Sequence, residues 1–216
     1  MPYKLSPHTL NLYEACKRCF WLAVKEQKTR PSGPFPSLPS GMDLALKKYF
    51  DSYREQQKLP PELQEKIENA KLFSDTDLLT IWRNQRKGLL WTNNQNNTLM
   101  GALDEVLQTD DGKLIVLDYK TRGFPLKDTP NYYTLQLETY NFLLRKNGFE
   151  TENYSHLLFF HPAEFTPQGA TFKTQLVTIQ TNADHAEQVF QNAICVLNNP
   201  KPKRQKNCIY CQWNRE

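Results

Sequence analysis

The sequence lacks the long apolar runs that membrane-spanning and secreted proteins carry. No stretch approaches the roughly 18 consecutive apolar residues of a membrane span, and residues 1–4 show no basic region followed by an apolar segment. The chain also shows no internal repeat, and its one charge run is the basic tail at residues 201–206. We therefore expect a soluble, cytoplasmic protein.

The size and composition of the chain predict a single domain. With 216 residues, of which 39% are hydrophobic and 12% aromatic, the chain can bury one good core but is short for two large domains. The net charge of +4 permits a polyanionic partner, although many proteins with other partners are equally basic. Charge alone therefore does not identify the partner.

Hydrophobic periodicity and turn residues predict a mixed α/β chain. Ser6 followed by Pro7 is typical of a helix start, and Asp-Gly at 111–112 is a strong hairpin signal. The proline-rich segment 29–40 should form an extended loop. The expected helices are 6–25, 42–57, 62–70, 77–86, 132–146 and 183–197, and the expected strands are 98–108, 113–121, 156–161 and 171–179.

Charged residues in the predicted hairpin share one face of the sheet. Asp118 and Lys120 are two apart on a strand, so both side chains project to the same side, whereas Tyr119 points the other way. Asp104 lies on the preceding strand, and the Asp-Gly turn can bring its carboxylate across the ladder to Asp118. Two carboxylates beside one lysine form a site for a hard cation.

Such a site suits Mg²⁺ or Mn²⁺, which prefer oxygen ligands and lower the pKa of a bound water to produce a nucleophile. Lys120 would orient that water or help to deprotonate it, and would offset charge on a pentacovalent phosphate. The alternative is an ordinary cross-strand ion pair on a solvated sheet face, because a D-x-K tripeptide recurs by chance.

Three segments in a fixed order resemble a known family. Gly-Ala-Leu-Asp at 101–104, Asp-Tyr-Lys-Thr at 118–121 and Gln-Leu-Glu-Thr-Tyr at 136–140 resemble the motifs of the RecB-like branch of the PD-(D/E)XK nuclease superfamily. The resemblance implies an α/β, restriction-endonuclease-like core with a central mixed sheet flanked by helices. It also implies one nuclease domain over 1–216, with a helical insertion at about 41–90 and a catalytic core at about 98–198.

The resemblance extends the site to the helix that carries the third motif. Gln136 and Tyr140 are four apart and share a helix face that can lie over the active site, although Tyr140 could equally pack in the core. The family usually supplies a metal-binding His after a Gly, but Gly-Met-Asp-Leu-Ala at 41–45 has none. Asp43 is the nearby hard ligand and receives a metal role. The competing interpretation is a helix-start residue that interacts with the N-terminal dipole, and the number of ions stays open.

Four of the five cysteines form two C-x-x-C pairs at opposite ends of the chain. Cys16 and Cys19 form the first pair, and Cys208 and Cys211 form the second. This spacing is typical of tetrahedral thiolate sites, and without a secretion signal metal ligation is favoured over disulfides. The fold must therefore join the N- and C-terminal segments at a four-cysteine cluster, which closes a very long loop. Cys195, among apolar neighbours, is expected to be a small buried hydrophobe.

The metal at this cluster is not decided by spacing, because four cysteines bind a [4Fe-4S] cluster or Zn²⁺. The pattern resembles an iron-sulfur subset of the RecB-like family, and this resemblance favours the iron-sulfur cluster. Those members often carry one N-terminal and three C-terminal cysteines, so the two-plus-two pattern departs from theirs.

Basic and aromatic residues flank both cysteine pairs. They are Lys17, Arg18, Phe20, Trp21, Lys203, Arg204, Lys206, Tyr210 and Trp213. They could grip a phosphate backbone and stack unpaired bases, or the aromatic rings could shield the cluster. The resemblance implies a nuclease that hydrolyses DNA, either as an exonuclease or directed to single strands or free ends, with RNA as the alternative substrate. It also implies a helicase or an integration complex as partner. The alternatives are a catalytically silent nucleic-acid-binding module with the same fold and cluster, and a zinc-stapled interaction protein.

Overall fold

The computed structural model describes residues 2–31, 33, 37–128, 131–167 and 169–213. Its centre is a five-stranded mixed sheet with the order β2-β5-β6-β7-β8. These strands are β2 (Ala70–Leu72), β5 (Glu105–Thr109), β6 (Leu114–Thr121), β7 (Tyr154–Thr166) and β8 (Gly169–Gln180). β6 and β7 are parallel, and the other pairs are antiparallel. The predicted mixed sheet flanked by helices is confirmed.

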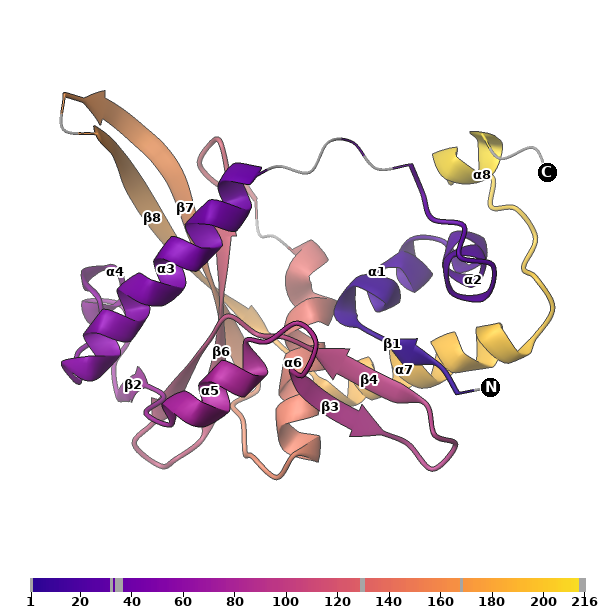
Figure 1. Ribbon diagram of the computed structural model, residues 1–216, viewed down its shortest axis with the longest axis horizontal. Coiled ribbons are helices and arrows are strands. Elements are labelled where there is room, and N and C mark those ends of the chain that lie inside the picture. The colour runs from indigo at the N-terminus through magenta and orange to yellow at the C-terminus, as the bar shows by residue number, and fades with distance from the viewer. Residues whose placement is uncertain (1, 32, 34–36, 129–130, 168, 214–216) are drawn as a thin grey trace.

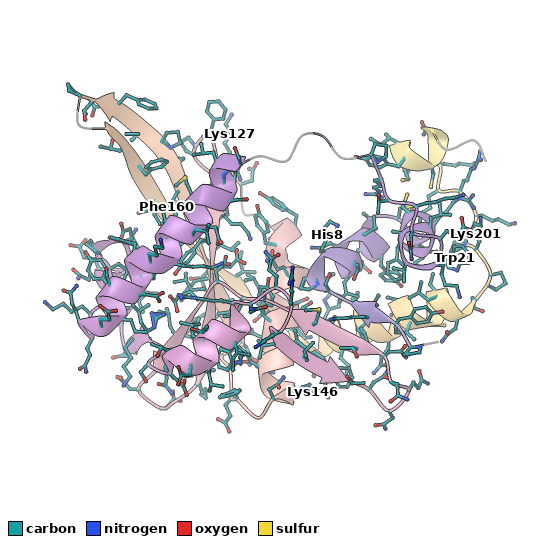
Figure 2. All side chains as sticks on the ribbon, viewed as in Figure 1. His8, Trp21, Lys127, Lys146, Phe160 and Lys201 are labelled. Atoms are coloured by element: carbon teal, nitrogen blue, oxygen red, sulfur yellow. The ribbon has the colours of Figure 1, made fainter. Side chains whose placement is uncertain are left out.

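Helices cover both faces of this sheet because alternate strand residues are apolar on both sides. Leu157 and Phe159 of β7 join the core beneath α6 (Thr134–Lys146) and α7 (Ala183–Asn198). Leu158 and Phe160 join the other core, beneath α3 (Ser37–Glu55) and α4 (Pro61–Gln64). In Figure 1, α3 and α6 lie on opposite sides of β6, and Figure 2 marks Phe160 on the α3 side.

A second, three-stranded sheet has the order β1-β4-β3. Its strands are β1 (Lys4–Leu5), β3 (Leu89–Thr92) and β4 (Thr98–Gly101), and β1 is parallel to β4. The expected single strand 98–108 is therefore wrong: β4 and β5 belong to different sheets, and residues 102–104 separate them. The chain turns there after Gly101, whose Cα packs against α6, and the amide of Leu103 bonds the carbonyl of Trp82 at 3.2 Å.

Several helices differ in extent from the expected ones. The first is split at Cys16 into α1 (Pro7–Ala15) and α2 (Lys17–Lys25), because Cys16 takes an extended conformation and caps α2. α3 begins at Ser37 rather than 42, so the helix takes in the end of the segment expected to be a loop. The segment 62–70 is mostly non-helical and leads into β2, and 77–86 narrows to α5 (Thr76–Trp82). Besides helices, the segment 41–90 thus contributes an edge strand.

The N-terminal helix α2 and the C-terminal helix α8 (Ile209–Trp213) lie together on the side of the molecule away from α3. Figure 1 shows the two helices side by side there. The indole of Trp21 donates to the carbonyl of Asn199 at 3.1 Å, and the ammonium of Lys201 lies 5.5 Å from the Trp21 ring centroid (Figure 2). Among the described residues, no helix has the length and apolar character needed to cross a bilayer.

Candidate active site and four-cysteine centre

Asp118 and Lys120 project from β6 toward α6, as their spacing predicts. They pair in register with Leu157 and Phe159, whose side chains belong to the core beneath α6. Asp118 is almost fully buried, and its Oδ2 atom forms an ion pair with Nζ of Lys120. The Lys120 ammonium also lies 4.6 Å from the centroid of the Tyr133 ring. A carboxylate and an ammonium therefore meet near the C-terminal end of this strand.

Asp104 lies in the break between β4 and β5, not on a strand as expected. Its Oδ2 atom accepts a hydrogen bond of 3.2 Å from the backbone N–H of Tyr119. This bond brings the Asp104 carboxylate beside β6 between Asp118 and Lys120. Because Asp104 lies in the break between β4 and β5, its side chain can reach the backbone of β6 although Asp104 has no paired partner on that strand.

Gln136 connects the remaining parts of the site from the first turn of α6. Its amide nitrogen donates to Oδ1 of Asp118 at 3.0 Å and to the hydroxyl of Tyr140 at 2.9 Å. Its amide oxygen lies 3.4 Å from Nζ of Lys120. The close packing of Tyr140 depends on Gly101, because a Cβ there would lie 2.8 Å from Cε1 of the Tyr140 ring. The Tyr140 ring is buried, and its hydroxyl bonds Gln136.

Lys47 of α3 was not foreseen and lies between two acidic residues. Its Nζ atom is 3.1 Å from Oδ1 of Asp104 and 2.8 Å from Oδ2 of Asp43. Asp43 is in the second turn of α3, so the interpretation of Asp43 as a helix-start residue is wrong. Its described contact is with Lys47, through which it is joined to Asp104. Asp43 and Lys120 line one hollow between α3 and the end of β6.

A buried charge network lies behind Asp104, and sequence reasoning missed it. Glu105 is fully buried and pairs with Arg54 and, at 2.9 Å, with Arg83. The Tyr119 hydroxyl donates to Glu105 at 3.1 Å. Arg83 also donates from Nε to the carbonyl of Asp104 at 2.8 Å. These contacts fix the backbone of Asp104 and so the position of its carboxylate.

Burial sets the electrostatics of the site. Burial raises the pKa of Asp118, Lys120 lowers it and Asp104 raises it, and the net result is a pKa of about 7. Burial lowers the pKa of Lys47, but the Asp104 and Asp43 carboxylates outweigh it, so the net shift of this pKa is upward. Burial and the nearby Asp118 raise the pKa of Tyr140, which stays neutral. The site thus holds more negative charge than its buried surroundings favour.

The donor set fits a hard divalent cation. Asp104 lies near enough to Asp118 for its charge to raise the pKa of Asp118, and carboxylate oxygens are the ligands that Mg²⁺ and Mn²⁺ prefer. Among the described residues, Oδ2 of Asp118 meets Lys120 as an ion pair but accepts no hydrogen bond of normal geometry. A buried carboxylate oxygen in this situation is stabilised by a further positive charge.

The four cysteines predicted to form a cluster come together between α2 and α8. The sulfur of Cys16 lies 3.4 Å from that of Cys211, and the sulfur of Cys19 lies 3.6 Å from that of Cys208 and 3.9 Å from that of Cys211. All four thiols are free and buried. They form a metal-binding group at the junction of the N- and C-terminal segments.

Around this centre one expectation is wrong, and of the two interpretations left open for the aromatic rings the packing one is supported for Phe20 and Tyr210. Cys195 is exposed, because it lies on the outer side of α7, so its assignment as a buried hydrophobe is wrong. Phe20 is fully buried in the main core, and Tyr210 packs against the cysteines, so these two rings serve packing rather than base stacking. The side chain of Trp213 lies outside the described residues. The guanidinium of Arg30 lies 4.5 Å from the Tyr210 ring centroid.

Comparison with known proteins places the chain in a family. Residues 4–215 match the model of the PD-(D/E)XK nuclease superfamily, and the chain belongs to this superfamily. Membership implies nuclease activity in general. No curated protein matches the sequence. Among solved structures, the crystal structure of SSO0001 is similar, with 14% identity and a TM-score of 0.44 over 94% of this chain and 80% of that chain.

Proposed function

We propose that the protein is a divalent-metal-dependent deoxyribonuclease of the RecB-like branch, acting on single-stranded DNA or on DNA ends. The observation that carries the proposal is the convergence of Asp104, Asp118, Lys120 and Gln136, from the β4–β5 break, β6 and α6, at one partly buried point. An ordinary solvated ion pair does not require a glutamine from a third element to bridge both charges. We further propose that residues 1–216 form a single nuclease domain.

Each residue of the site has a distinct role in this proposal. Asp104 and Asp118 hold Mg²⁺ or Mn²⁺, which when bound polarises a phosphate oxygen and lowers the pKa of water. Lys120 orients the attacking water and offsets charge that develops on the phosphate. Gln136 holds Asp118 and Lys120 at their separation, and Tyr140 holds Gln136. Asp43 acts through Lys47 and serves as a ligand only if Lys47 withdraws.

Exposed aromatic side chains near the site support a substrate with unpaired bases. Phe124 follows β6 and is 78% exposed, and Tyr132 precedes α6 and is 61% exposed. The Tyr132 hydroxyl accepts from Arg122 at 3.2 Å, and Lys127 lies on the same connecting segment (Figure 2). Aromatic faces beside cationic side chains suit single strands, because every base has a stacking face and every phosphate a charge.

The test is cleavage of labelled single-stranded and double-stranded DNA with Mn²⁺, Mg²⁺ or EDTA. Wild-type protein should cleave with either ion and not with EDTA, and Lys120→Ala and Asp118→Asn should lose cleavage by about a hundredfold or more while remaining folded. Lys48→Ala, an exposed lysine one position from Lys47, is the matched control and should cleave normally.

Three results would contradict the proposal in different ways. Cleavage retained by Asp118→Asn would remove the site assignment. Salt-sensitive DNA binding without metal-dependent cleavage by the wild-type protein would establish the catalytically silent binding module instead. If the protein cleaved RNA faster than DNA, the proposed DNA substrate would be wrong, but the proposed active-site residues would stand.

A further inference from the structure

The spacing of the four cysteine sulfur atoms carries information about which metal they bind. Three sulfur pairs are 3.4, 3.6 and 3.9 Å apart. All four sulfur atoms lie within 4.8 Å of one another. Since a disulfide bond is about 2.05 Å long, the sulfurs are too far apart to be covalently paired and too close to be unrelated.

These separations fit ligands that share one ion. An ion with metal–sulfur bonds of about 2.3 Å at the centre of a regular tetrahedron places its four sulfur atoms about 3.8 Å apart. The measured pairs scatter around this value. Each C-x-x-C pair supplies two corners, with Cys16 at the start of α2 and Cys208 just before α8.

An iron-sulfur cube does not fit the same positions. In a [4Fe-4S] cluster each thiolate binds a different iron atom and points away from the centre of the cube, so the thiolates lie farther apart than ligands of a single ion. A [2Fe-2S] cluster would separate two thiolates from the other two, whereas here every pair lies within 4.8 Å. The preference for iron-sulfur that came from the resemblance is therefore not supported by the geometry.

We infer that the four-cysteine centre binds one tetrahedral Zn²⁺ and serves as a structural clasp between the two ends of the chain. Zinc is favoured over a single Fe²⁺ because it binds more tightly to the same ligands. Four protein ligands leave no open position, which is typical of structural rather than catalytic zinc. This inference does not depend on the proposed nuclease activity.

The neighbours of the sulfurs suit a site with net negative charge. Four thiolates around one Zn²⁺ carry two negative charges in excess. The backbone N–H of Cys19 points to the sulfur of Cys16 at 3.5 Å, and Nη2 of Arg30 lies 3.7 Å from the sulfur of Cys208. Hydrogen bonds and a nearby cation of this kind stabilise the thiolates in the surrounding shell. Arg30 therefore adds a contact from outside both C-x-x-C pairs to this centre.

The experiment is metal analysis of the full chain purified anaerobically from cells supplied with both iron and zinc. We expect one zinc atom per chain by elemental analysis, no acid-labile sulfide and no visible absorption. X-ray absorption at the zinc edge should show one shell of four sulfur atoms near 2.3 Å and no neighbouring metal. Replacement of zinc by Co²⁺ should give the intense visible bands of a tetrahedral thiolate site at one cobalt per chain.

Two variants distinguish the four ligand cysteines from the fifth cysteine, Cys195. Cys195→Ser, which alters the exposed cysteine, should keep full zinc content, whereas Cys208→Ser should lose zinc and unfold more readily. Iron with labile sulfide in the anaerobic protein, iron alone at one atom per chain, or a metal-free protein that does not take up Zn²⁺ or Co²⁺ would each overturn the inference. The cobalt spectrum is recorded on wild-type protein, so the inference stays testable if Cys208→Ser does not fold.

Discussion

Arg83→Met should destabilise the protein strongly, because Arg83 holds three groups at once. Its guanidinium bonds the carbonyl of Asp104 at 2.8 Å, Glu105 at 2.9 Å and Asp51 at 2.9 Å, and its side chain is 13% exposed. Removal of one partner of a buried ion pair costs about 3–5 kcal/mol. Since Arg54 and Tyr119 still contact Glu105, we expect the lower end, about 3 kcal/mol.

This loss corresponds to a fall in Tm of about 6–12 °C for a chain of this size. The assay is thermal and urea unfolding at matched metal content. Arg86→Met, at an exposed arginine three residues away, is the control and should change the free energy of unfolding by less than about 0.5 kcal/mol. If the free energy of unfolding of Arg83→Met lay within about 1 kcal/mol of the wild-type value, the conclusion that this network holds the Asp104 segment in place would be refuted.

Three further perturbations test other contacts. Gly101→Ala should cost about 1–3 kcal/mol in unfolding free energy and reduce cleavage, because the new Cβ would lie 2.8 Å from the Tyr140 ring. Burial lowers the pKa of His156 from 6.5 to about 4, so the stability that neutral His156 gives is complete above pH 6.5 and is lost as the pH falls to 4. His156→Gln should therefore abolish about 3 kcal/mol of the acid-induced loss in unfolding free energy. Lys47→Ala should tighten Mn²⁺ binding, read by electron paramagnetic resonance, about three- to fivefold, because Lys47 shares Asp104 with the ion.

Each of these predictions has a result that contradicts it, and His156→Gln also has a control variant. Full activity and stability of Gly101→Ala would show that Tyr140 can move freely. His8→Gln, at an exposed histidine, should leave the acid slope unchanged, and an unchanged slope in His156→Gln would exclude His156 as its source. Weaker Mn²⁺ binding by Lys47→Ala would mean that Lys47 organises the carboxylates rather than competing with the ion.

Local patterns in the sequence predict those parts of the site that lie on regular elements. Period-two spacing places Asp118 and Lys120 on one face, and period-four spacing places Gln136 and Tyr140 together, because each pair belongs to one strand or one helix. The cysteine pairs are likewise recognisable from their local spacing. Their meeting follows from the chemistry of thiolate sites rather than from any contact visible in the sequence.

The rest depends on contacts between distant segments. The apolar run 98–108 reads as one strand, and only the packing of Gly101 against α6 shows why the chain must change sheets before Asp104. Lys47 resembles its exposed neighbour Lys48 in the sequence, and only the approach of Asp104 distinguishes them. Cys195 stands among apolar residues, yet helical geometry turns it outward. Helix and strand periods specify faces, whereas these outcomes depend on which element covers each face.

The catalytic and cysteine centres are physically connected through α6. The four-cysteine centre includes Cys16 at the start of α2, the edge-to-face contact of Tyr13 with Phe20 ties α2 to α1, and α1 packs against α6. α6 in turn presents Gln136 to Asp118 at 3.0 Å. Asp118 and Lys120 themselves stand two residues apart on β6, so the central sheet positions them and Gln136 of α6 supports their contact. The clasp therefore contributes to the active site by holding the helix that bridges the two charges, and not by holding the charges themselves.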